Sequence, residues 1–191
     1  MRIIFIRHGK TAGNIEKRYI GSQDIPLCDI GIAEIKNKVR QNIYPDIDVL
    51  VSSPMQRCTQ TAEIIYPDKE LHIVENLHEC NFGDFEGKTY EDLCTDINFQ
   101  NMITRKGKSS FPNGETYEDF KNRCVTAFLE TTEQFKNCGV LAFVIHGGTI
   151  MTTFETLCRP KKDFYDYMLG NGCGYICDFD NGILTIKNKI Q

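Results

Sequence analysis

Two histidines stand at the ends of apolar runs, and each is followed by glycine, a pattern suited to chemistry on a bound ligand. Ile3–Ile6 leads into Arg7-His8-Gly9, and Leu141–Ile145 leads into His146-Gly147-Gly148. Glycine permits a tight turn and a close approach of the backbone to a ligand. An imidazole ring can attack phosphorus and hold the phosphoryl group covalently. The pattern therefore indicates phosphoryl transfer, with His8 as the candidate nucleophile.

Two arginines add the positive charge that a phosphate site needs. Arg7 directly precedes the first histidine, and Arg57 falls in the first turn of a helix that Ser53-Pro54 is predicted to open. That helix follows a third short apolar run, Val49–Val51. Arginine offers forked N–H donors to phosphate oxygens. Because ligands of parallel sheets bind beyond the carboxyl ends of the strands, we expect both arginines and both histidines on one rim of the sheet.

Cleavage of a phosphate ester also needs an acid for the departing oxygen, and Glu79 is the candidate. It lies in the segment Leu77–Gly83, and a carboxyl group can act as a general acid. The like charge of a bound phosphate dianion favours the protonated carboxyl. His146, if protonated, can stabilise charge on the transferring group. The candidate set holds no carboxylate cluster of the kind that binds magnesium, so we expect a site without metal or other cofactor.

The remaining patterns predict the elements that position these residues. The three apolar runs are short, as is typical of parallel strands covered on both faces. A stripe from Ile32 to Ile43 indicates one helix, and Thr116 caps another, which we expect to run until Gly139. Asp180-Asn181-Gly182 predicts a hairpin. Strands that alternate with helices predict a three-layer α/β/α sandwich with a mainly parallel sheet.

We expect this sandwich to be a single domain over residues 1–191, with a small cap-like insertion around 89–113 beside the site. Leu93, Phe99, Met102 and Phe111 of that segment either surround the leaving group of the substrate or pack the cap's own core.

Composition limits the partners. Lys and Arg number 22 against 26 Asp and Glu, a net charge of −4, which argues against nonspecific nucleic-acid binding. No apolar stretch approaches the ~18 residues that span a bilayer, and the first apolar run is too short for a secretory signal. The nine cysteines form no C-x-x-C pair and are interpreted as reduced, small apolar residues. We expect a cytoplasmic protein that binds neither nucleic acid nor membrane, and the oligomeric state stays open.

The segment Arg7–Asn14 resembles the signature of the histidine phosphatase superfamily, the phosphoglycerate mutase-like proteins. Further segments resemble, in order, that family's substrate loop, second arginine motif, proton-donor segment and second histidine motif: Tyr19–Leu27, Ser52–Ala62, Leu77–Gly87 and Val144–Gly148. The resemblance implies the phosphoglycerate mutase-like fold and a phosphohistidine intermediate on His8. It implies that Glu79 is the proton donor and then the base. It assigns the phosphate pocket to a set of residues: Arg7, Arg57, His146, Asn14, Gly147 and the backbone of Gly21.

Within that superfamily the chain is most similar to the α-ribazole phosphatases, which remove a 5′-phosphate in cobalamin nucleotide-loop assembly. The similar segments are Gly83–Gly87, Phe111–Glu115 and Asn171–Tyr175. The resemblance implies a small phosphorylated metabolite as substrate, α-ribazole 5′-phosphate first. Two residues depart from the pattern. Ile20 stands where mutases have a hydroxyl residue, and Lys10 stands where an acidic residue is common.

The sequence leaves three alternatives open. One is a broad-specificity sugar-phosphate or fructose-bisphosphate phosphatase, and another is a phosphoglycerate mutase with the same intermediate. The third is of another class: a catalytically inactive binding protein. The presence of the full set of catalytic candidates argues against the third, because an inactive relative usually lacks at least one of them: His8, Glu79, His146, Arg7 and Arg57.

Overall fold

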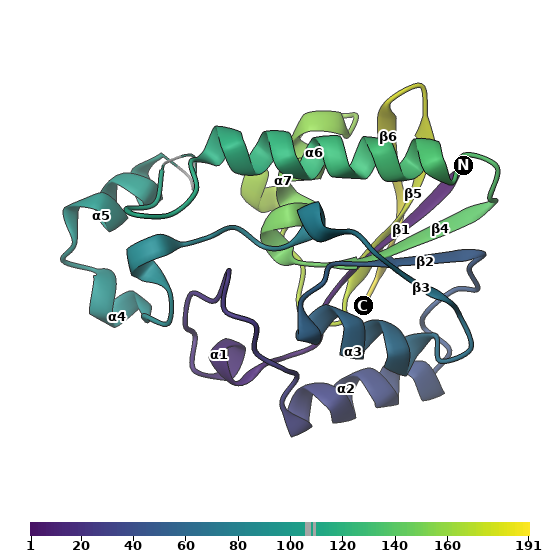
Figure 1. Ribbon diagram of the computed structural model, residues 1–191, viewed down its shortest axis with the longest axis horizontal. Coiled ribbons are helices and arrows are strands. Elements are labelled where there is room, and N and C mark those ends of the chain that lie inside the picture. Colours follow the sequence, from purple (N-terminus) through teal and green to yellow (C-terminus); the bar gives the residue numbers. More distant parts are fainter. Residues whose placement is uncertain (106–107, 109) are drawn as a thin grey trace.

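Across residues 1–105, 108 and 110–191, which the computed structural model describes, six strands form one mixed sheet (Figure 1). Their order is β3-β2-β4-β1-β5-β6, and the first four are parallel, whereas β5 and β6 are antiparallel to their neighbours. The strands are β1 (Arg2–Arg7), β2 (Val49–Ser52), β3 (Leu71–Ile73), β4 (Val140–Ile145), β5 (Gly174–Asp180) and β6 (Ile183–Ile190).

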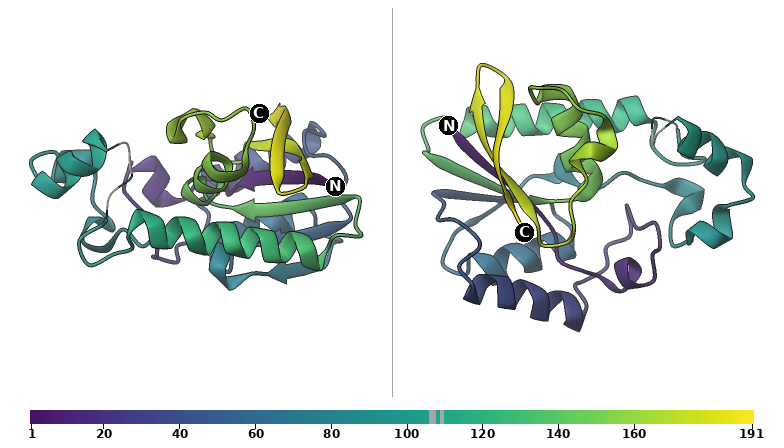
Figure 2. Two further views of the ribbon diagram at one scale, coloured as in Figure 1. Left: turned by 90° about the horizontal axis from the view of Figure 1, so that it is seen from above. Right: turned by 180° about the vertical axis from the view of Figure 1, so that it is seen from behind.

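Helices cover both faces of this sheet, which confirms the predicted three-layer sandwich. Figures 1 and 2 show the sheet lying between helices on its two faces. The helices are α1 (Ala12–Ile15), α2 (Asp29–Arg40), α3 (Gln56–Ile65), α4 (Tyr90–Leu93), α5 (Ile97–Thr104), α6 (Tyr117–Gln134) and α7 (Gly147–Leu157), with short 3-10 turns η1 (Glu75–Leu77), η2 (Gly83–Phe85) and η3 (Phe164–Tyr167).

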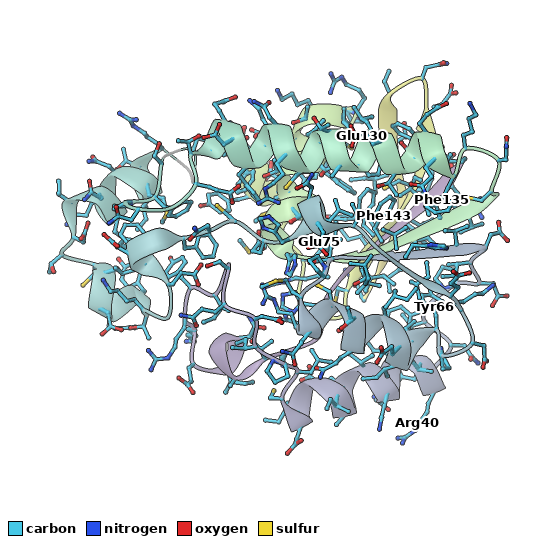
Figure 3. All side chains as sticks on the ribbon, viewed as in Figure 1. Arg40, Tyr66, Glu75, Glu130, Phe135 and Phe143 are labelled. Atoms are coloured by element: carbon cyan, nitrogen blue, oxygen red, sulfur yellow. The ribbon has the colours of Figure 1, made fainter. Side chains whose placement is uncertain are left out.

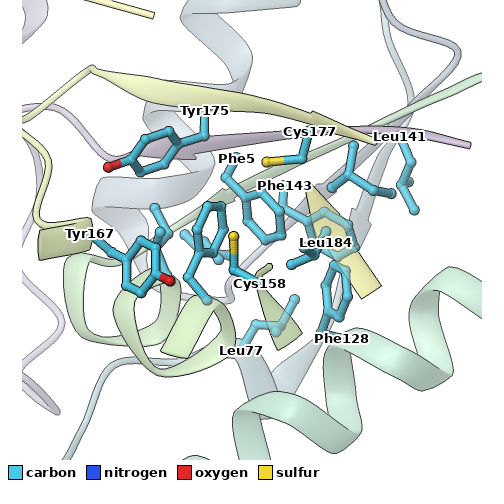
Figure 4. Packing of buried hydrophobic residues seen from close by; sticks show 14 of the residues in the cluster. Phe5, Leu77, Phe128, Leu141, Phe143, Cys158, Tyr167, Tyr175, Cys177 and Leu184 are labelled. Carbon is cyan, nitrogen blue, oxygen red and sulfur yellow. The ribbon is translucent and has the colours of Figure 1, made fainter. Parts of the chain in front are cut away.

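The face of the sheet towards α6 and α7 holds an aromatic core (Figure 4). Phe5 of β1 and Phe143 of β4 lie opposite each other in the sheet, so their side chains point to the same face. Their rings lie 5.6 Å apart between centroids. Phe128 of α6 lies 5.4 Å from Phe5, and Phe154 of α7 packs edge-on to Phe5 at 4.8 Å. These contacts fix α6 and α7, and therefore the start of α7 at the site.

The opposite face packs against α2 and α3. Ile4 and Ile6 of β1 share a buried cluster with Ile35 of α2 and Ala62 of α3. Arg40, at the exposed end of α2, projects away from the sheet, whereas Phe143 lies between the sheet and α6 (Figure 3). The alternation in β1 therefore buries both of its faces, as the continuous apolar run predicts.

The predicted hairpin and the Thr116 cap are confirmed, and three boundaries differ. Asn181 and Gly182 have positive φ and join β5 to β6, and Thr116 caps α6 by accepting the N–H of Asp119. α2 and α6 end before Ile43 and Gly139, and α3 begins at Gln56 instead of after Ser53. The cause at α3 is tertiary, because the Ser53 hydroxyl hydrogen-bonds His146 Nε2 at 2.7 Å and is not an N-cap.

The 89–113 segment contributes α4 and α5, which lie beyond the carboxyl ends of the parallel strands (Figures 1 and 2). Residues 106, 107 and 109 of this segment are outside the described residues. Leu93 and Phe99 are fully buried there in a separate apolar cluster with Met102 and Phe111. Leu93 and Phe99 therefore pack the cap's own core.

Cysteines contribute to the core as thiols. All nine are described and unpaired, and five are buried: Cys58, Cys80, Cys124, Cys158 and Cys177. Burial raises the pKa of Cys58, Cys80 and Cys177 well above the ordinary thiol value, which keeps them protonated and apolar. Among the described residues, no helix has the length and apolar character needed to cross a membrane.

Candidate active site

A cavity of about 470 Å³ opens between the carboxyl ends of β1 and β4 and the cap. Its floor is polar, and its walls are mainly apolar. Six of the predicted site residues line the cavity: Gly147 and five that contribute side chains to its floor, Arg7, His8, Asn14, Arg57 and Glu79. Of the four residues that the strand-end argument placed on one rim, Arg7, His8 and Arg57 line the cavity and His146 does not. Asn14 reaches the cavity from α1, and Glu79 reaches it from the segment between η1 and η2.

His8 is held in one orientation by its own loop. It continues β1, where its N–H donates to Ile145 O at 3.0 Å, and its side chain is buried. Nδ1 lies 2.7 Å from Gly9 O. Because a carbonyl oxygen can only accept, Nδ1 carries the proton and Nε2 keeps its lone pair. Nε2 is thus the nitrogen available for attack on phosphorus.

The surroundings of His8 keep the ring neutral. Burial lowers the pKa of His8 well below its ordinary value, and Arg57 and Arg7 lower it further, while the hydrogen bond to Gly9 O acts in the opposite direction. Two positive charges near an imidazole disfavour imidazolium. The neutral form is the one that can act as a nucleophile.

Arg57 is the largest of the fully buried side chains, and it links the loop Tyr19–Leu27 to the end of β4. Nη1 donates to Gln23 O and Nη2 to Gly21 O, each at 2.8 Å. Nε donates to His146 Nδ1 at 3.3 Å. Each terminal nitrogen carries a second N–H beyond these contacts. Arg57 can therefore hold the loop and still donate to a ligand in the cavity.

Arg7 has a donor that no described residue satisfies. Nη1 donates to Leu169 O at 2.5 Å, whereas Nε is buried and without a partner among the described residues. A buried unsatisfied N–H costs about 1–3 kcal/mol. Burial also lowers the pKa of Arg7, although Glu79 opposes this shift. A phosphate oxygen in the cavity would satisfy Nε.

His146 directly follows β4 and lies behind the cavity floor, with its ring centroid 5.3 Å from that of His8. Nδ1 accepts from Arg57, so Nε2 carries the proton and donates to the Ser53 hydroxyl. Burial lowers the pKa of His146 well below its ordinary value, and Arg57 and His8 lower it further. Without a ligand the ring is therefore neutral, and a bound dianion would counter the effect of the nearby positive charge.

Glu79 is buried at the cavity floor, and backbone N–H groups hold both of its oxygens. Oε1 accepts from Cys80 N at 3.0 Å and Oε2 from Gly148 N at 2.9 Å. A Cβ atom at position 148 would lie 2.3 Å from Oε1. The second glycine after His146 is therefore required for this close approach.

The other predicted phosphate contacts differ in position. Asn14 and Gly147 line the cavity, and Gly21 does not. Asn14 Oδ1 accepts from Thr11 N at 3.1 Å and Asn171 Nδ2 at 3.2 Å, which leaves the amide nitrogen as the end able to donate to a ligand. The N–H of Gly21 donates to Glu86 Oε2 at 3.0 Å.

Lys10 and Ile20, the two residues that depart from the family pattern, lie in different surroundings. Lys10 Nζ forms a half-exposed ion pair with Glu34 at 2.6 Å. Ile20 lines the cavity and packs so closely on Gly13 that a Cβ there would lie 2.4 Å from Ile20 Cγ1. Ile20 therefore supplies apolar wall where a hydroxyl would supply a donor.

The sequence patterns do not single out two further residues that position the site, Glu86 and Asn171. Glu86 accepts hydrogen bonds from the backbone N–H groups of Gly21, Ser22 and Phe82. Asn171 donates to His8 O at 3.1 Å as well as to Asn14. Both lie in segments that carry the resemblance, which was the available signal, but their roles depend on contacts distant in sequence.

The cavity walls are rich in apolar and aromatic side chains. Met102 and Phe111 line them, whereas Leu93 and Phe99 do not. The wall residues come from the loop Tyr19–Leu27, the segment before η2, the cap, α6 and the region of α7 and η3: Tyr19, Ile20, Phe82, Met102, Ile103, Phe111, Tyr117, Phe120, Met151, Phe164, Tyr165 and Met168. Within the described part of the chain, no group of three or more His, Cys, Asp or Glu side chains could hold a metal ion.

The lowered histidine pKa values make stability depend on pH. The ordinary pKa of histidine is about 6.5, so both side chains bind protons below that pH in the unfolded chain. In the folded chain the buried rings of His8 and His146 stay neutral there, because their pKa values are lowered. The free energy of unfolding should therefore be highest above pH 6.5 and fall as pH decreases, by roughly 1 kcal/mol per pH unit for each histidine.

Urea unfolding at pH 7.5 and pH 5.5 measures this loss. We expect His8→Ala and His146→Asn each to reduce the difference between the two pH values by about 1 kcal/mol, with His72→Ala as the matched control. A pH dependence identical to that of wild type in both variants would contradict the prediction.

Paired arginine donors around an imidazole with an available lone pair define the class of protein, an enzyme of phosphoryl transfer. The family follows from comparison with known proteins. The chain belongs to the histidine phosphatase superfamily (branch 1), whose family model matches residues 3–189. It is thus a phosphatase, a phosphoric monoester hydrolase.

Individual relatives agree with this assignment over nearly the whole chain. The adenosylcobalamin/alpha-ribazole phosphatase of Salmonella typhimurium is 27% identical over 201 residues, covering 98% of this chain and 95% of that protein. The alpha-ribazole phosphatase of Shigella flexneri has the same fold, with a TM-score of 0.87, 24% identity and coverage of 100% and 96%. A mutant phosphoserine phosphatase of Entamoeba histolytica, solved with phosphoserine, gives a TM-score of 0.86, 29% identity and coverage of 100% and 96%.

Proposed function

We propose that the protein hydrolyses phosphomonoesters through a phosphohistidine on His8, and that its substrate is α-ribazole 5′-phosphate. The observation that carries the mechanism is the orientation of His8, whose Nδ1 is bound to Gly9 O and whose Nε2 retains its lone pair. The same side chain is buried beside two arginines. Neutral imidazole next to fixed positive charge suits attack on a dianionic ester.

In the first step His8 Nε2 forms a bond to phosphorus while the bond from phosphorus to the leaving oxygen breaks. Glu79 gives its proton to that oxygen, and the alcohol leaves. In the second step Glu79 takes a proton from water, whose oxygen attacks the phosphoryl group. The bond from phosphorus to Nε2 breaks, and inorganic phosphate and neutral His8 result. Positioning and charge neutralisation supply most of the rate in phosphoryl transfer.

The floor of the cavity would hold the phosphoryl oxygens. Arg7 Nε lacks a partner among the described residues. Arg57 and Asn14 line the cavity, and each has N–H groups beyond those used in the bonds described above. His146 would act from behind the floor, because its Nδ1 accepts from Arg57 Nε and so orients the guanidinium. Gly147 lets Arg7 approach, since a Cβ there would lie 3.3 Å from Arg7 Nε.

Two observations support α-ribazole 5′-phosphate, whose leaving group carries a flat aromatic base, as the substrate. Relatives that share almost the full length are named alpha-ribazole phosphatases. The cavity walls beyond the phosphate floor are apolar and aromatic, which suits a flat, uncharged aromatic group. Among the described residues, Arg18 is the one cation that lines those walls, and its Nε and Nη1 already donate to Glu16 and to Gly87 O. A second phosphate or a carboxylate on the substrate would therefore find little compensation.

Substrate ranking tests this assignment. Under one set of conditions, kcat/KM for α-ribazole 5′-phosphate should rank among the highest of a panel that includes 3-phosphoglycerate, phosphoserine, glucose 6-phosphate and fructose 1,6-bisphosphate. An apolar pocket discriminates by only about 1–3 kcal/mol per methylene-sized difference, so measurable side activities are expected. If glucose 6-phosphate or 3-phosphoglycerate exceeded it by more than about tenfold, the substrate assignment would fail and the phosphatase class would remain.

A further inference from the structure

The segment that carries Glu79 has little regular structure of its own. It connects η1 to η2, and its carbonyl groups find a donor on α6. Arg123 Nη1 donates to the carbonyl oxygens of Asn76 at 2.9 Å and His78 at 3.0 Å, and Nη2 donates to Glu79 O at 3.4 Å. One guanidinium thus binds three carbonyls over four consecutive residues.

Glu115 fixes that guanidinium and binds the other side of the same segment. Arg123 Nε donates to Glu115 Oε1 at 3.0 Å, and Nη2 donates to Oε2 at 2.9 Å. Oε2 also accepts the backbone N–H of Asn81 at 2.9 Å. Burial acts to raise the pKa of Glu115, but the hydrogen bonds from Arg123 and Asn81 outweigh it and lower the pKa. Glu115 therefore stays charged in this pair.

Together the two side chains hold the backbone on both sides of Glu79. Arg123 binds the carbonyls up to and including Glu79, and Glu115 binds the amide two residues later. Neither Arg123 nor Glu115 lines the cavity, so neither can touch a substrate there. Their side chains are only 15% and 20% exposed, and all five N–H groups of the guanidinium have acceptors.

We propose that the Arg123–Glu115 pair is a positioning element for Glu79, one that sets where the carboxyl group meets the leaving oxygen. This inference rests on the proposed role of Glu79 as the acid. A bidentate guanidinium–carboxylate pair is stronger and more directional than a single ion pair, and a lysine in place of Arg123 could not span the same acceptors. A displacement of about 1 Å in a catalytic group can cost on the order of 100-fold in rate.

The leaving group separates this role from simple stabilisation of the fold. An alkyl phosphate needs protonation of its leaving oxygen, whereas p-nitrophenyl phosphate needs little. A displaced Glu79 therefore slows the first step for the alkyl ester selectively. A variant that merely reduced the folded fraction would lower both rates by the same factor.

The test is rapid-quench measurement of the first turnover with n-butyl phosphate and with p-nitrophenyl phosphate. We expect Arg123→Met to lower the butyl rate by about 10- to 100-fold and the nitrophenyl rate by less than about threefold. Arg123→Lys should show the same selective loss, because its single ammonium cannot bind all the acceptors. Lys136→Met, an exposed residue just beyond α6, is the control and should match wild type on both esters.

Glu115→Gln provides a second variant should Arg123→Met fail to fold, and it should produce a smaller loss with the same selectivity. Adding Arg123→Met to Glu79→Gln should not lower the butyl rate further if the arginine acts through that carboxyl. Equal losses on both esters, or a further loss in the double variant, would overturn the positioning role. If Glu79→Gln lowered the rates with both esters equally, the proposed role of Glu79 as the acid would be wrong, and the failure would lie in the proposed function.

Discussion

Replacing His8 with alanine should remove essentially all turnover and leave the fold intact. The side chain would make and break the bond to phosphorus, and removing the nucleophile of a covalent hydrolase costs on the order of 10⁶ in kcat. Arg7, Arg57 and Asn14 remain in the variant, so binding of inorganic phosphate should change little. The expected loss therefore lies in kcat and not in affinity for the phosphoryl group.

Three measurements check this expectation. Wild type quenched during turnover should carry base-stable, acid-labile phosphate, and His8→Ala should carry none. Isothermal titration with inorganic phosphate should give similar affinity for both proteins. His72→Ala is the matched histidine control, because its ring packs against Phe135 far from the cavity. Turnover of His8→Ala within about tenfold of wild type would rule out the nucleophile assignment.

The parts of the site at strand ends were predictable from sequence because the signals are local. An apolar run that ends in histidine and glycine predicts both a buried strand and a polar residue at its carboxyl end. β1 and β4 pair in parallel, with Arg7 opposite Ile145, so His8 and His146 follow at the same edge. Parallel pairing is what converts two separate motifs into one cavity floor.

Other features depend on contacts that sequence patterns do not report. Ser53 has the side chain of an N-cap, but its hydroxyl bonds His146, 93 positions away. The N–H of Gly21 is bound by Glu86, 65 positions away. β3 has only three residues, too few to show the alternation of apolar and polar residues that would predict a strand. In each case a tertiary partner, and not local propensity, decides the outcome.

The cap shows a different limit of sequence reasoning. The hydrophobic character of a residue alone does not show whether its side chain lines a ligand cavity or packs in a core. The apolar cluster of the cap contributes side chains to both. Phe99 is wholly buried, whereas Met102, three positions later on α5, lines the cavity. The side of a short helix that faces the site is set by how the cap packs on the phenylalanines around it, including Phe85 and Phe111.

The Glu79→Gln variant should be slow in the first step with an alkyl ester and slow in the second step with an aryl ester. Glutamine keeps the size of the side chain but cannot donate a carboxyl proton, and general acid–base catalysis contributes about 10²- to 10⁴-fold. We therefore expect the first-turnover rate with n-butyl phosphate to fall within that range, and the rate with p-nitrophenyl phosphate to fall less. The second step also needs Glu79 as a base, so phosphohistidine should accumulate on the variant when the aryl ester is used. Glu75→Gln, an exposed carboxyl at the start of η1 (Figure 3), is the matched control. Equal loss on both esters, without accumulation of phosphohistidine, would show that Glu79 is neither the acid nor the base.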